Sequence, residues 1–358
     1  MIENYRKMIT GIIVVTILIV LEIALLTYKK TRSLKPESIP KQYQPSKISR
    51  VSFLAFGDIN LGRTIGQKIL KIGVAYPFEK YNIREDSSDI VFANLECQIS
   101  FQNGETGHPK YNLVFTAPPE ATTTLQHSGV DIVSTANNHA LDYGYKALGE
   151  TIENLKKANI LFVGTSNNEK TLFDPLIIEK NNIKIAIFAV TSFVNIALKD
   201  WKKSIASPDT IVLKTKIAQV RSSVDIVILS YHGGVEYIDT PIKKVRDFAK
   251  WSIENDVDIF LGHHPHVTYG VEKKGKKFIV HSLGNFVFYQ PQHYWTQRGY
   301  GLKFIFEKND SVTSIDIQKF YPLNVSLQTK RLNDSTELAK LFNRTQQLSN
   351  IDLTPYWK

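Results

Sequence analysis

The sequence predicts an α/β fold preceded by one N-terminal transmembrane helix, and three observations support this prediction. From residue 50 onward, short runs of β-branched and aromatic residues alternate with amphipathic stretches, which is the pattern of an α/β domain. A run of twenty almost entirely aliphatic residues stands near the N-terminus. Clusters of histidine, carboxylate and carboxamide side chains directly follow several of the apolar runs, as expected where a site is built on the ends of buried strands.

The alternating region predicts eight strands, four helices, a hairpin and a final helix. The strands are expected at residues 51–56, 90–93, 132–135, 160–163, 183–190, 226–229, 259–261 and 278–280. The helices are expected at residues 64–72, 117–127, 145–158 and 241–255, the last with Pro241 in its first turn and Thr240 or Asp239 as its cap. The hairpin joins residues 301–306 to 312–320, and the final helix covers residues 335–348.

Composition and charge narrow the class of protein. A chain of 358 residues with 43% hydrophobic and 22% charged residues has the usage of an ordinary globular protein with a large core. Residues 1–50 hold nine Lys or Arg and three Asp or Glu, a net of +6, which leaves +4 of the total +10 for the other 308 residues. Because the basic charge belongs mostly to the N-terminal segment, we expect no nucleic-acid partner.

The single cysteine, Cys97, excludes an intrachain disulfide and a zinc site built from thiolates. We interpret it as a small apolar filler at a strand end, with a nucleophilic role as the alternative.

The apolar run at residues 9–28 predicts a membrane anchor. Its twenty residues include one charge, Glu22, near the end of the run, and about twenty apolar residues are enough for a helix to span the hydrocarbon layer. No small-residue cleavage site follows, so we expect an uncleaved anchor; the lack of a polar face argues against the alternative, a buried core helix. The predicted organisation is an anchor at residues 1–30, a polar linker at 31–49, a body at 50–325 and a C-terminal helical extension at 326–358.

Five polar clusters follow predicted strands, and the last is the strongest signal. The clusters are Gly57-Asp58-Ile59-Asn60, Asn94-Leu95-Glu96, Asn137-Asn138-His139, Tyr231-His232-Gly233-Gly234-Val235-Glu236-Tyr237 and Gly262-His263-His264-Pro265-His266. Neutral imidazole is the commonest transition-metal ligand among side chains, and the last cluster places three imidazoles within four residues. Taken singly, the first two clusters also fit polar turns at strand ends, and the last fits a solvated histidine-rich loop.

Taken together, the clusters predict a centre for two divalent metal ions. They supply seven nitrogen or oxygen ligands: Asp58, Asn60, Glu96, Asn138, His232, His264 and His266. Two ions that share a bridging carboxylate about 3.5–4 Å apart generate hydroxide at neutral pH and clamp an in-line displacement. A ligand set without sulfur favours Mn, Fe or Zn.

Further residues are expected around this centre. Asp142, three residues after His139, is placed to orient the imidazole ring. We expect His263, Glu236 and Asn285 to contact substrate. For Asn285, contact with groups that support the metal ligands and a simple turn are the alternatives. A long polar loop at residues 101–116 is expected to overhang the site.

These motifs resemble the CapA family of poly-γ-glutamate capsule biosynthesis proteins, which is similar in turn to the calcineurin-like metallophosphoesterases. The resemblance spans roughly residues 51–290 and is carried by the segments "FGDINLGR", "FANLE", "ANNHALDYG", "YHGGVEY", "GHHPH" and "SLGNFVF". It implies a four-layer α/β/β/α sandwich with the site on loops at the strand ends. It also implies that Glu96 bridges the ions, that Asn138 is a ligand, and that His139 is the general acid or stabilises the transition state.

The resemblance also carries the functional expectation. It implies a membrane-anchored component of poly-γ-glutamate synthesis or export that acts on an anionic polymer, beside the ligase and the integral membrane subunits of a capsule synthase. It places the body outside the cytoplasmic membrane. The basic residues that flank the anchor, two before it and four after it, favour the cytoplasmic side instead; we follow the resemblance because the two counts differ by two charges.

Two alternatives stay open. Asn60 and Glu96 stand where metallophosphoesterases carry a histidine and an aspartate, which weakens or alters one metal site. The protein is then either a non-catalytic scaffold that binds polymer or assists assembly, or a generic extracytoplasmic metallophosphoesterase.

Overall fold

The computed structural model of the chain describes residues 1–32, 48–310 and 312–357. It divides into two compact units, Met1–Ser46 and Lys47–Lys358. The predicted polar linker at residues 31–49 falls largely on residues outside the described ranges. The predicted extension at residues 326–358 lies within the second unit, and its division from the body stays a prediction.

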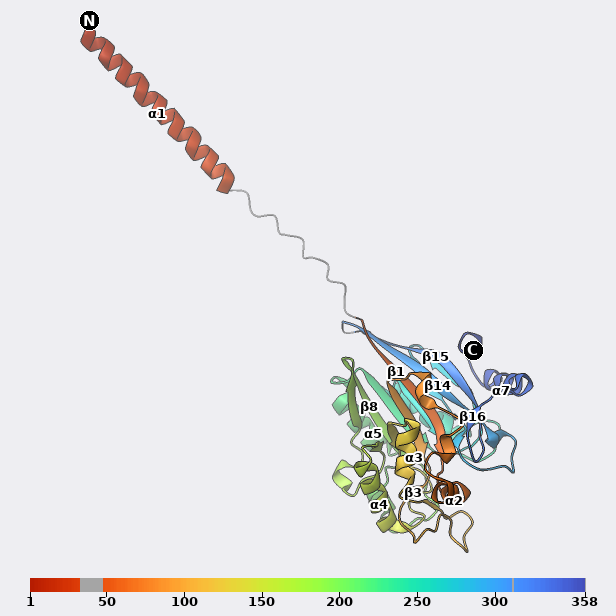
Figure 1. Cartoon of the computed structure of the whole chain (residues 1–358). Coiled ribbons are helices and arrows are strands. Elements are labelled where there is room, and N and C mark those ends of the chain that lie inside the picture. The colour runs from red at the N-terminus through yellow and green to blue at the C-terminus, as the bar shows by residue number, and fades with distance from the viewer. Residues whose placement is uncertain (33–47, 311, 358) are drawn as a thin grey trace. The chain divides into compact units, whose positions relative to one another are not determined.

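The first unit contains one long apolar helix, α1, at Ile2–Arg32 (Figure 1). At 1.5 Å per residue its 31 residues extend about 46 Å, more than the roughly 30 Å of a hydrocarbon core. None of its residues is buried. Within the described part of the chain, α1 is the one helix long and apolar enough to cross a membrane.

The second unit, which we call the body, is built on a large and a small sheet (Figure 1). The strands of the large sheet, in spatial order, are β16 (Lys330–Arg331), β15 (Val312–Asn324), β14 (Arg298–Asn309), β1 (Ser49–Ile59), β2 (Ile90–Leu95), β5 (Ile132–Ser134) and β6 (Leu161–Val163), and β13 (Asn285–Val287) also pairs with β1. From β1 to β6 the strands are parallel. Strands β14 and β15 form the predicted hairpin and run antiparallel to their neighbours.

The small sheet is parallel at its centre and antiparallel at its edges. Its order is β11 (Val271–Lys274), β12 (Lys277–Val280), β10 (Ile259–His263), β9 (Ile226–His232), β8 (Ile183–Thr191) and β7 (Leu176–Lys180). The four central strands are parallel, while β11 and β7 pair antiparallel. A separate two-stranded sheet joins β3 (Gln98–Ile99) to β4 (Thr116–Ala117).

Three hydrophobic clusters show that the body has four layers. The first cluster lies between the two sheets and joins residues such as Phe53 and Phe92 of the large sheet to Ile187 and Ile228 of the small sheet. The second lies between the large sheet and the helices α2 (Arg63–Ile72) and α3 (Ala121–Ser128). The third lies between the small sheet and the helices α5 (Thr210–Arg221) and α6 (Lys243–Glu254). The predicted α/β/β/α sandwich is therefore confirmed.

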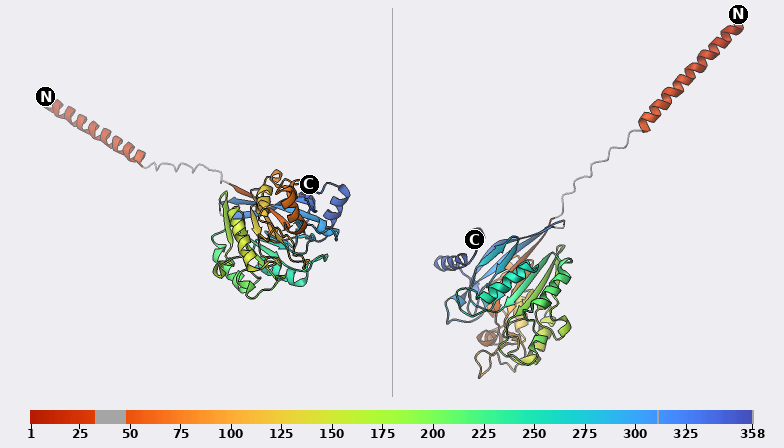
Figure 2. Two further views of the ribbon diagram at one scale, coloured as in Figure 1. Left: turned by 60° about the horizontal axis from the view of Figure 1, so that its bottom comes forward. Right: turned by 180° about the vertical axis from the view of Figure 1, so that it is seen from behind.

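The remaining helices close the edges of the sandwich. Helix α4 (Gly144–Lys157) contributes buried side chains to both the first and the second cluster. Helix α7 (Ser335–Gln347) lies beside β15, away from the helices of the outer layers (Figures 1 and 2). After it, Trp357 packs on Phe320 with ring centroids 5.0 Å apart.

All eight predicted strands and all five predicted helices are present, but two helix starts are wrong. Helix α3 begins at Ala121 because Ala117 belongs to strand β4, and Pro118 and Pro119 form the turn that leads from the strand into the helix. Helix α6 begins at Lys243 with Ile242 at the N-cap position and no side-chain cap. Pro241 therefore precedes the helix, and neither Thr240 nor Asp239 caps it.

Candidate metal centre

The ends of five strands bring the predicted ligands to one place. Strands β1, β2 and β5 are parallel neighbours in the large sheet, as β9 and β10 are in the small sheet. Carboxyl ends of parallel strands meet at the same edge of a sheet, and the two sheets stack with these edges together. Eight polar side chains with at most 5% exposure gather there: Asp58, Asn60, Glu96, Asn138, His139, His232, His264 and His266.

Unusual backbone positions make this convergence possible. A Cβ atom on Gly57 would stand 1.7 Å from the carbonyl oxygen of Gly284, so only glycine lets β1 approach that turn. His264 and His266 have φ of 100° and 59°, in the left-handed region that non-glycine residues rarely adopt. Such conformations persist where the surroundings enforce them and are concentrated at functional sites.

Two groups of potential ligands share one carboxylate. Glu96, His232 and His264 form one group, and Asp58, Glu96 and His266 form another; within each, the ligand atoms lie within 4.8 Å of one another. The Asn138 amide oxygen lies beside the first group, at hydrogen-bond distance (2.7 Å) from His232 Nε2. Glu96 is common to both groups.

The surroundings of Glu96 fit a bound cation. The side chain is fully buried, and neither carboxylate oxygen has a hydrogen-bond partner among the described residues. Nε2 of His232, His266 and His139 stands 3.6, 3.7 and 3.9 Å from Oε1, too far for hydrogen bonds. Ligands that share one tetrahedral ion at 2.0–2.1 Å are about 3.4 Å apart, so the gaps from His232 and His266 suit atoms that coordinate rather than hydrogen-bond.

Burial sets the protonation of these groups. It raises the pKa of Glu96 well above its usual range, and the nearby Asp58 carboxylate adds to this. It lowers the pKa of His232 well below its usual range and that of His264 to about 4, in each case with a neighbouring imidazole contributing. The imidazoles of His232 and His264 are therefore neutral at pH 7, the form that binds a metal.

Asp58 is held as an anion by groups around it. Burial acts to raise its pKa, but the His263 and His266 imidazoles outweigh this and hold the pKa well below its usual range. Asn94 Nδ2 donates to Oδ1 at 2.8 Å, and the backbone N–H of His264 donates to Oδ2 at 3.2 Å. Asn94 was not singled out from the sequence as a site residue.

The three residues expected to contact substrate differ in their surroundings. His263 is 1% exposed and its Nδ1 stands 3.3 Å from Asp58 Oδ1, so the geometry favours support of Asp58. Asn285 is fully buried, and its amide oxygen meets His266 Nδ1 at 2.9 Å, which orients that ring. The Glu236 side chain is 36% exposed and groups with His264 and His266, so it is the one of the three open to a ligand.

His139 stands beside the ligands as a candidate proton donor. Its Nδ1 is 2.7 Å from Asp142 Oδ2, and Asp142 also accepts from the backbone N–H of Phe115 at 3.0 Å. The Asn195 amide lies 3.3–3.4 Å from both ring nitrogens of His139. No sequence motif marks Asn195, which comes from a loop of the other half of the chain.

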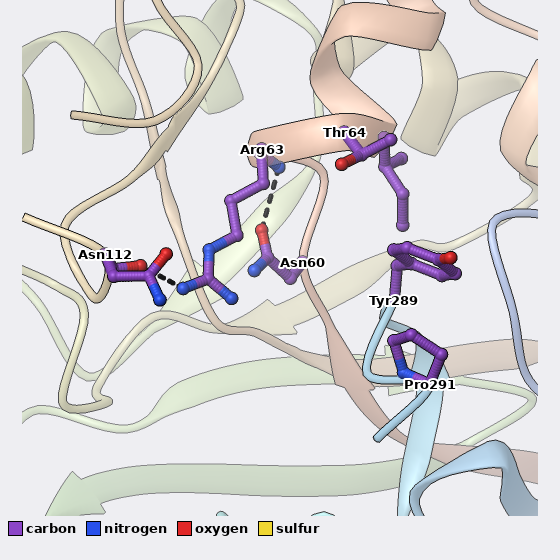
Figure 3. A pocket seen from close by; sticks show the side chains of 8 residues that line it. Asn60, Arg63, Thr64, Asn112, Tyr289 and Pro291 are labelled. Carbon is purple, nitrogen blue, oxygen red and sulfur yellow. Dashed lines mark hydrogen bonds between the residues drawn. The ribbon is translucent and has the colours of Figure 1, made fainter. Parts of the chain in front are cut away.

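A cavity opens next to Asn60 (Figure 3). We call it the Asn60 cavity; its volume is about 300 Å³, and its lining includes Arg63, Asn112, Tyr289 and Pro291. The Asn60 amide oxygen accepts from the backbone N–H of Gly62 at 2.8 Å, which fixes the turn into α2.

The predicted loop at residues 101–116 lies close by. Its residues 105–108, 111, 112 and 114 line a second cavity of about 500 Å³ that shares Arg63 with the first. We call this the loop cavity.

The alternative role for Cys97 finds no support in its surroundings. Burial raises the pKa of its thiol to about 12, so the thiol stays protonated at neutral pH, and the nucleophile would be the thiolate. Packing explains this residue.

The fold and the site together define a class: a two-sheet α/β/β/α protein with a candidate metal centre at its strand ends. Residues 52–290 match a family described as bacterial capsule synthesis protein PGA_cap. The chain belongs to this family.

Relatives of known name agree with this assignment. The chain is 28% identical over 284 residues to the capsule biosynthesis protein CapA of Bacillus anthracis, covering 77% of this chain and 68% of the relative. It is 28% identical over 308 residues to the PGA biosynthesis protein CapA of Bacillus subtilis, covering 83% and 80%. Among solved structures, a putative 5'-nucleotidase from Staphylococcus aureus aligns at 13% identity with a TM-score of 0.45, over 80% of this chain and 55% of that one.

Proposed function

We propose that this protein is a membrane-anchored, metal-dependent component of poly-γ-glutamate capsule synthesis or export, and that its body hydrolyses the polymer or a related anionic substrate. One observation carries the proposal: Glu96 is fully buried, both of its oxygens lack a hydrogen-bond partner among the described residues, and it belongs to two groups of potential ligands. A buried carboxylate left without partners costs stability, so its retention indicates that a cation completes the site.

Two divalent ions are proposed as cofactors, held in part by different residues. Asp58, His266 and Asn60 would hold one ion, and Asn138, His232 and His264 the other, with Glu96 shared. The ligands are nitrogen and oxygen atoms without thiolates, which favours Mn, Fe or Zn. When bound, such ions supply an activated water and neutralise charge that develops on the substrate.

The protein's own residues would position and protonate the substrate. In hydrolysis of a γ-amide, the water oxygen bonds to the carbonyl carbon, the C–N bond breaks, and the leaving nitrogen takes a proton. His139 is placed to donate that proton, because its Nε2 faces Glu96 at 3.9 Å while Asp142 accepts from Nδ1. The contact with Asp142 also fixes the orientation of the His139 ring. Phosphoester hydrolysis would use the same donor for a leaving oxygen.

The cellular setting proposed here rests on α1 and on the family. Helix α1 would anchor the chain once in the cell membrane, with the body outside the cytoplasm. The ligase and the integral membrane subunits of the capsule synthase would be its partners, and the anionic polymer its substrate.

Metal content and hydrolysis, measured on the full chain in detergent micelles, test the proposal. We expect close to two equivalents of Mn, Fe or Zn per chain, and metal-dependent shortening of poly-γ-glutamate. His139→Ala should keep the metal and lose the hydrolysis, whereas His127→Ala, an exposed histidine at the end of α3, should keep both. A folded full chain that binds none of the three metals removes the mechanism.

A non-catalytic role is the second candidate, favoured by the replacement of phosphatase ligands at Asn60 and Glu96. It predicts that a strain carrying His139→Ala still produces capsule, whereas removal of residues 1–30 abolishes production.

A generic extracytoplasmic phosphoesterase is the third candidate. It predicts turnover of p-nitrophenyl phosphoesters and none of poly-γ-glutamate.

A further inference from the structure

Arg63 is the first residue of α2, and its positively charged guanidinium lies in the space beside the proposed metal centre. It lines both the Asn60 cavity and the loop cavity, and in Figure 3 its side chain extends toward Asn112 with Asn60 beside it. The guanidinium carbon stands 4.8 Å from the centre of the Phe115 ring. The same ring lies 4.0 Å from the ring of His139, so one aromatic side chain contacts both the cation and the candidate proton donor.

Most of the N–H donors of the guanidinium make no hydrogen bond to the described residues. Its one hydrogen bond among the described residues goes to the backbone carbonyl of Asn112, while an arginine side chain carries five N–H donors. In the described part of the chain no carboxylate oxygen lies within 4.0 Å of it. A half-buried cation without an anionic partner, facing two cavities, suits an anion that arrives with a ligand.

The backbone of Arg63 is fixed in an uncommon conformation. Its φ is 50°, in the left-handed region that arginine rarely adopts. Three contacts with the loop hold it there: its N–H donates to the Thr106 carbonyl at 2.7 Å, the Thr106 hydroxyl donates to its carbonyl at 2.8 Å, and its guanidinium binds Asn112. The surroundings therefore determine where this side chain points.

The two cavities adjoin and share their lining at Arg63, Thr64 and Asn112. We call the combined space the Arg63 groove. One end is walled by Tyr289 and Pro291 and the other by His108 and Tyr111. A groove with apolar or aromatic walls at both ends and a cation at its centre fits an extended chain that carries methylenes along its length and an anion at the side.

We propose that the Arg63 groove is the binding subsite for the polymer and that the Arg63 guanidinium pairs with a side carboxylate of a γ-glutamyl unit. The inference rests on the proposed function and specifies how the substrate is recognised there. A γ-linked glutamate chain has two methylenes and one free carboxylate per unit. The walls of the groove can contact the methylenes, and the Arg63 guanidinium can pair with the carboxylate. Arg63 thereby sets which unit of the chain lies across the metal ligands.

A carboxylate fits better than a phosphate. A guanidinium binds carboxylates and phosphates alike through two parallel hydrogen bonds, so the charge balance decides: one cation balances the single charge of a carboxylate. No second Lys or Arg lines either cavity, and the loop cavity contains Glu105, which opposes a more highly charged anion.

The test measures binding of a defined γ-glutamate oligomer to the metal-loaded full chain in detergent micelles. Arg63→Gln should weaken binding at least tenfold and reduce its dependence on salt, while Arg63→Lys recovers part of the affinity. Lys71→Gln removes the same charge from an exposed position at the other end of α2 and should change affinity less than twofold. An oligomer with its carboxylates converted to amides should bind wild type and Arg63→Gln equally weakly, and metal content should stay unchanged in all variants.

Other outcomes overturn the inference in distinct ways. If Arg63→Gln binds within twofold of Lys71→Gln, the guanidinium does not recognise the polymer. If Arg63→Gln weakens binding of the amidated oligomer by the same factor as binding of the charged oligomer, the role of Arg63 is structural. If inorganic phosphate competes better than glutarate, the subsite is for phosphate. If binding depends on Arg63 but the polymer is not hydrolysed, the subsite is supported and the catalytic proposal is refuted. If the polymer is hydrolysed but binding does not depend on Arg63, only the subsite is refuted.

Discussion

Replacement of Glu96 by glutamine is expected to change stability in opposite directions with and without metal. Without metal, wild type must bury a carboxyl group whose oxygens have no hydrogen-bond partner, at a cost of about 1–3 kcal/mol. Glutamine has nearly the same shape and no charge to neutralise. In the presence of a chelator, Glu96→Gln should therefore unfold at a temperature equal to or higher than wild type.

With metal the order should reverse. A ligand at a hundred times its dissociation constant stabilises the folded state by about 2.7 kcal/mol. In a body of this size that raises Tm by about 5–8 °C, at roughly 2–3 °C per kcal/mol. Because Glu96 belongs to both ligand groups, its replacement weakens both sites at once. We expect the metal-induced shift in Glu96→Gln to fall below about 2 °C at the metal concentration that saturates wild type.

The pH dependence gives an independent check. Burial raises the folded-state pKa of Glu96 above its ordinary value of 4.5. Such a group stabilises fully below its unfolded-state pKa and loses that contribution as pH rises toward the folded-state pKa. In chelator, wild type and Glu96→Gln should thus have similar Tm below about pH 4.5 and diverge above it, with the variant the more stable.

Differential scanning fluorimetry of the full chain in micelles, with and without EDTA, measures these shifts. Glu254→Gln, a neutralisation on the exposed side of α6, serves as the control and should respond to metal like wild type. An unchanged metal shift in Glu96→Gln would show that Glu96 is not a shared ligand. A lower Tm than wild type in chelator would refute the account of its burial.

Three further substitutions have definite expected outcomes. His139→Ala should lower kcat about 10²–10⁴-fold without loss of metal, because it removes the proton donor; turnover and elemental analysis measure this. Gly57→Ala should destabilise the body by more than about 4 kcal/mol, because its Cβ meets the Gly284 carbonyl oxygen at 1.7 Å; thermal unfolding measures it. Glu272→Gln should cost about 0.5–1 kcal/mol at pH 7, because the carboxylate pairs with His281 Nε2 at 2.7 Å. The His281 hydrogen bond lowers the pKa of Glu272, so this contribution is present above pH 4.5 and disappears as pH falls through the folded-state pKa.

Each of the three has an outcome that contradicts it. Loss of bound metal from His139→Ala would make the histidine a ligand rather than a donor. A Gly57→Ala variant as stable as wild type would show that β1 can move away from the turn at residue 284. If Glu272→Gln is still less stable than wild type at pH 3, the loss of stability comes from packing rather than from the charge of the carboxylate.

The grouping of polar side chains at the strand ends could be predicted because two local patterns coincide. Asp58, Glu96 and His264 each follow a run of buried residues, and a polar side chain in that position must find a partner. Parallel strands deliver such residues to one edge, so grouping follows from the topology. The sequence also placed Asp142 beside His139, since Asp142 comes three positions after His139, within one turn of the chain.

Residues that meet the centre from elsewhere could not be predicted. Asn195 and Arg63 contact the His139 region only through tertiary packing. Asn195 stands in none of the quoted segments, and Arg63 ends the segment "FGDINLGR" but was given no role there. His263 and Asn285 were expected to contact substrate. A sequence does not show whether a residue next to a buried carboxylate or imidazole faces the substrate or supports that group from the other side.

Elements with weak patterns were also missed. Helix α5 buries only Leu213 and Ile217, and this apolar stripe is too narrow to stand out in the sequence. Its N-cap is regular: the Asp209 carboxylate accepts from the N–H groups of Ile211 and Val212. The edge strands β7 and β11 carry few fully buried residues, because one side of each meets solvent rather than another strand.

Strand β1 joins the place where the chain enters the body to the place where Asp58 stands. Its eleven residues span about 35 Å, and it is held on one side by β14 and on the other by β2. The hydrogen bonds of these ladders run across the strand, so a pull applied at Ser49 along β1 loads them in shear and all together. In the function proposed above, tension on the anchored chain would enter the body through β1, so the mechanical strength of the body and the position of Asp58 would depend on one strand.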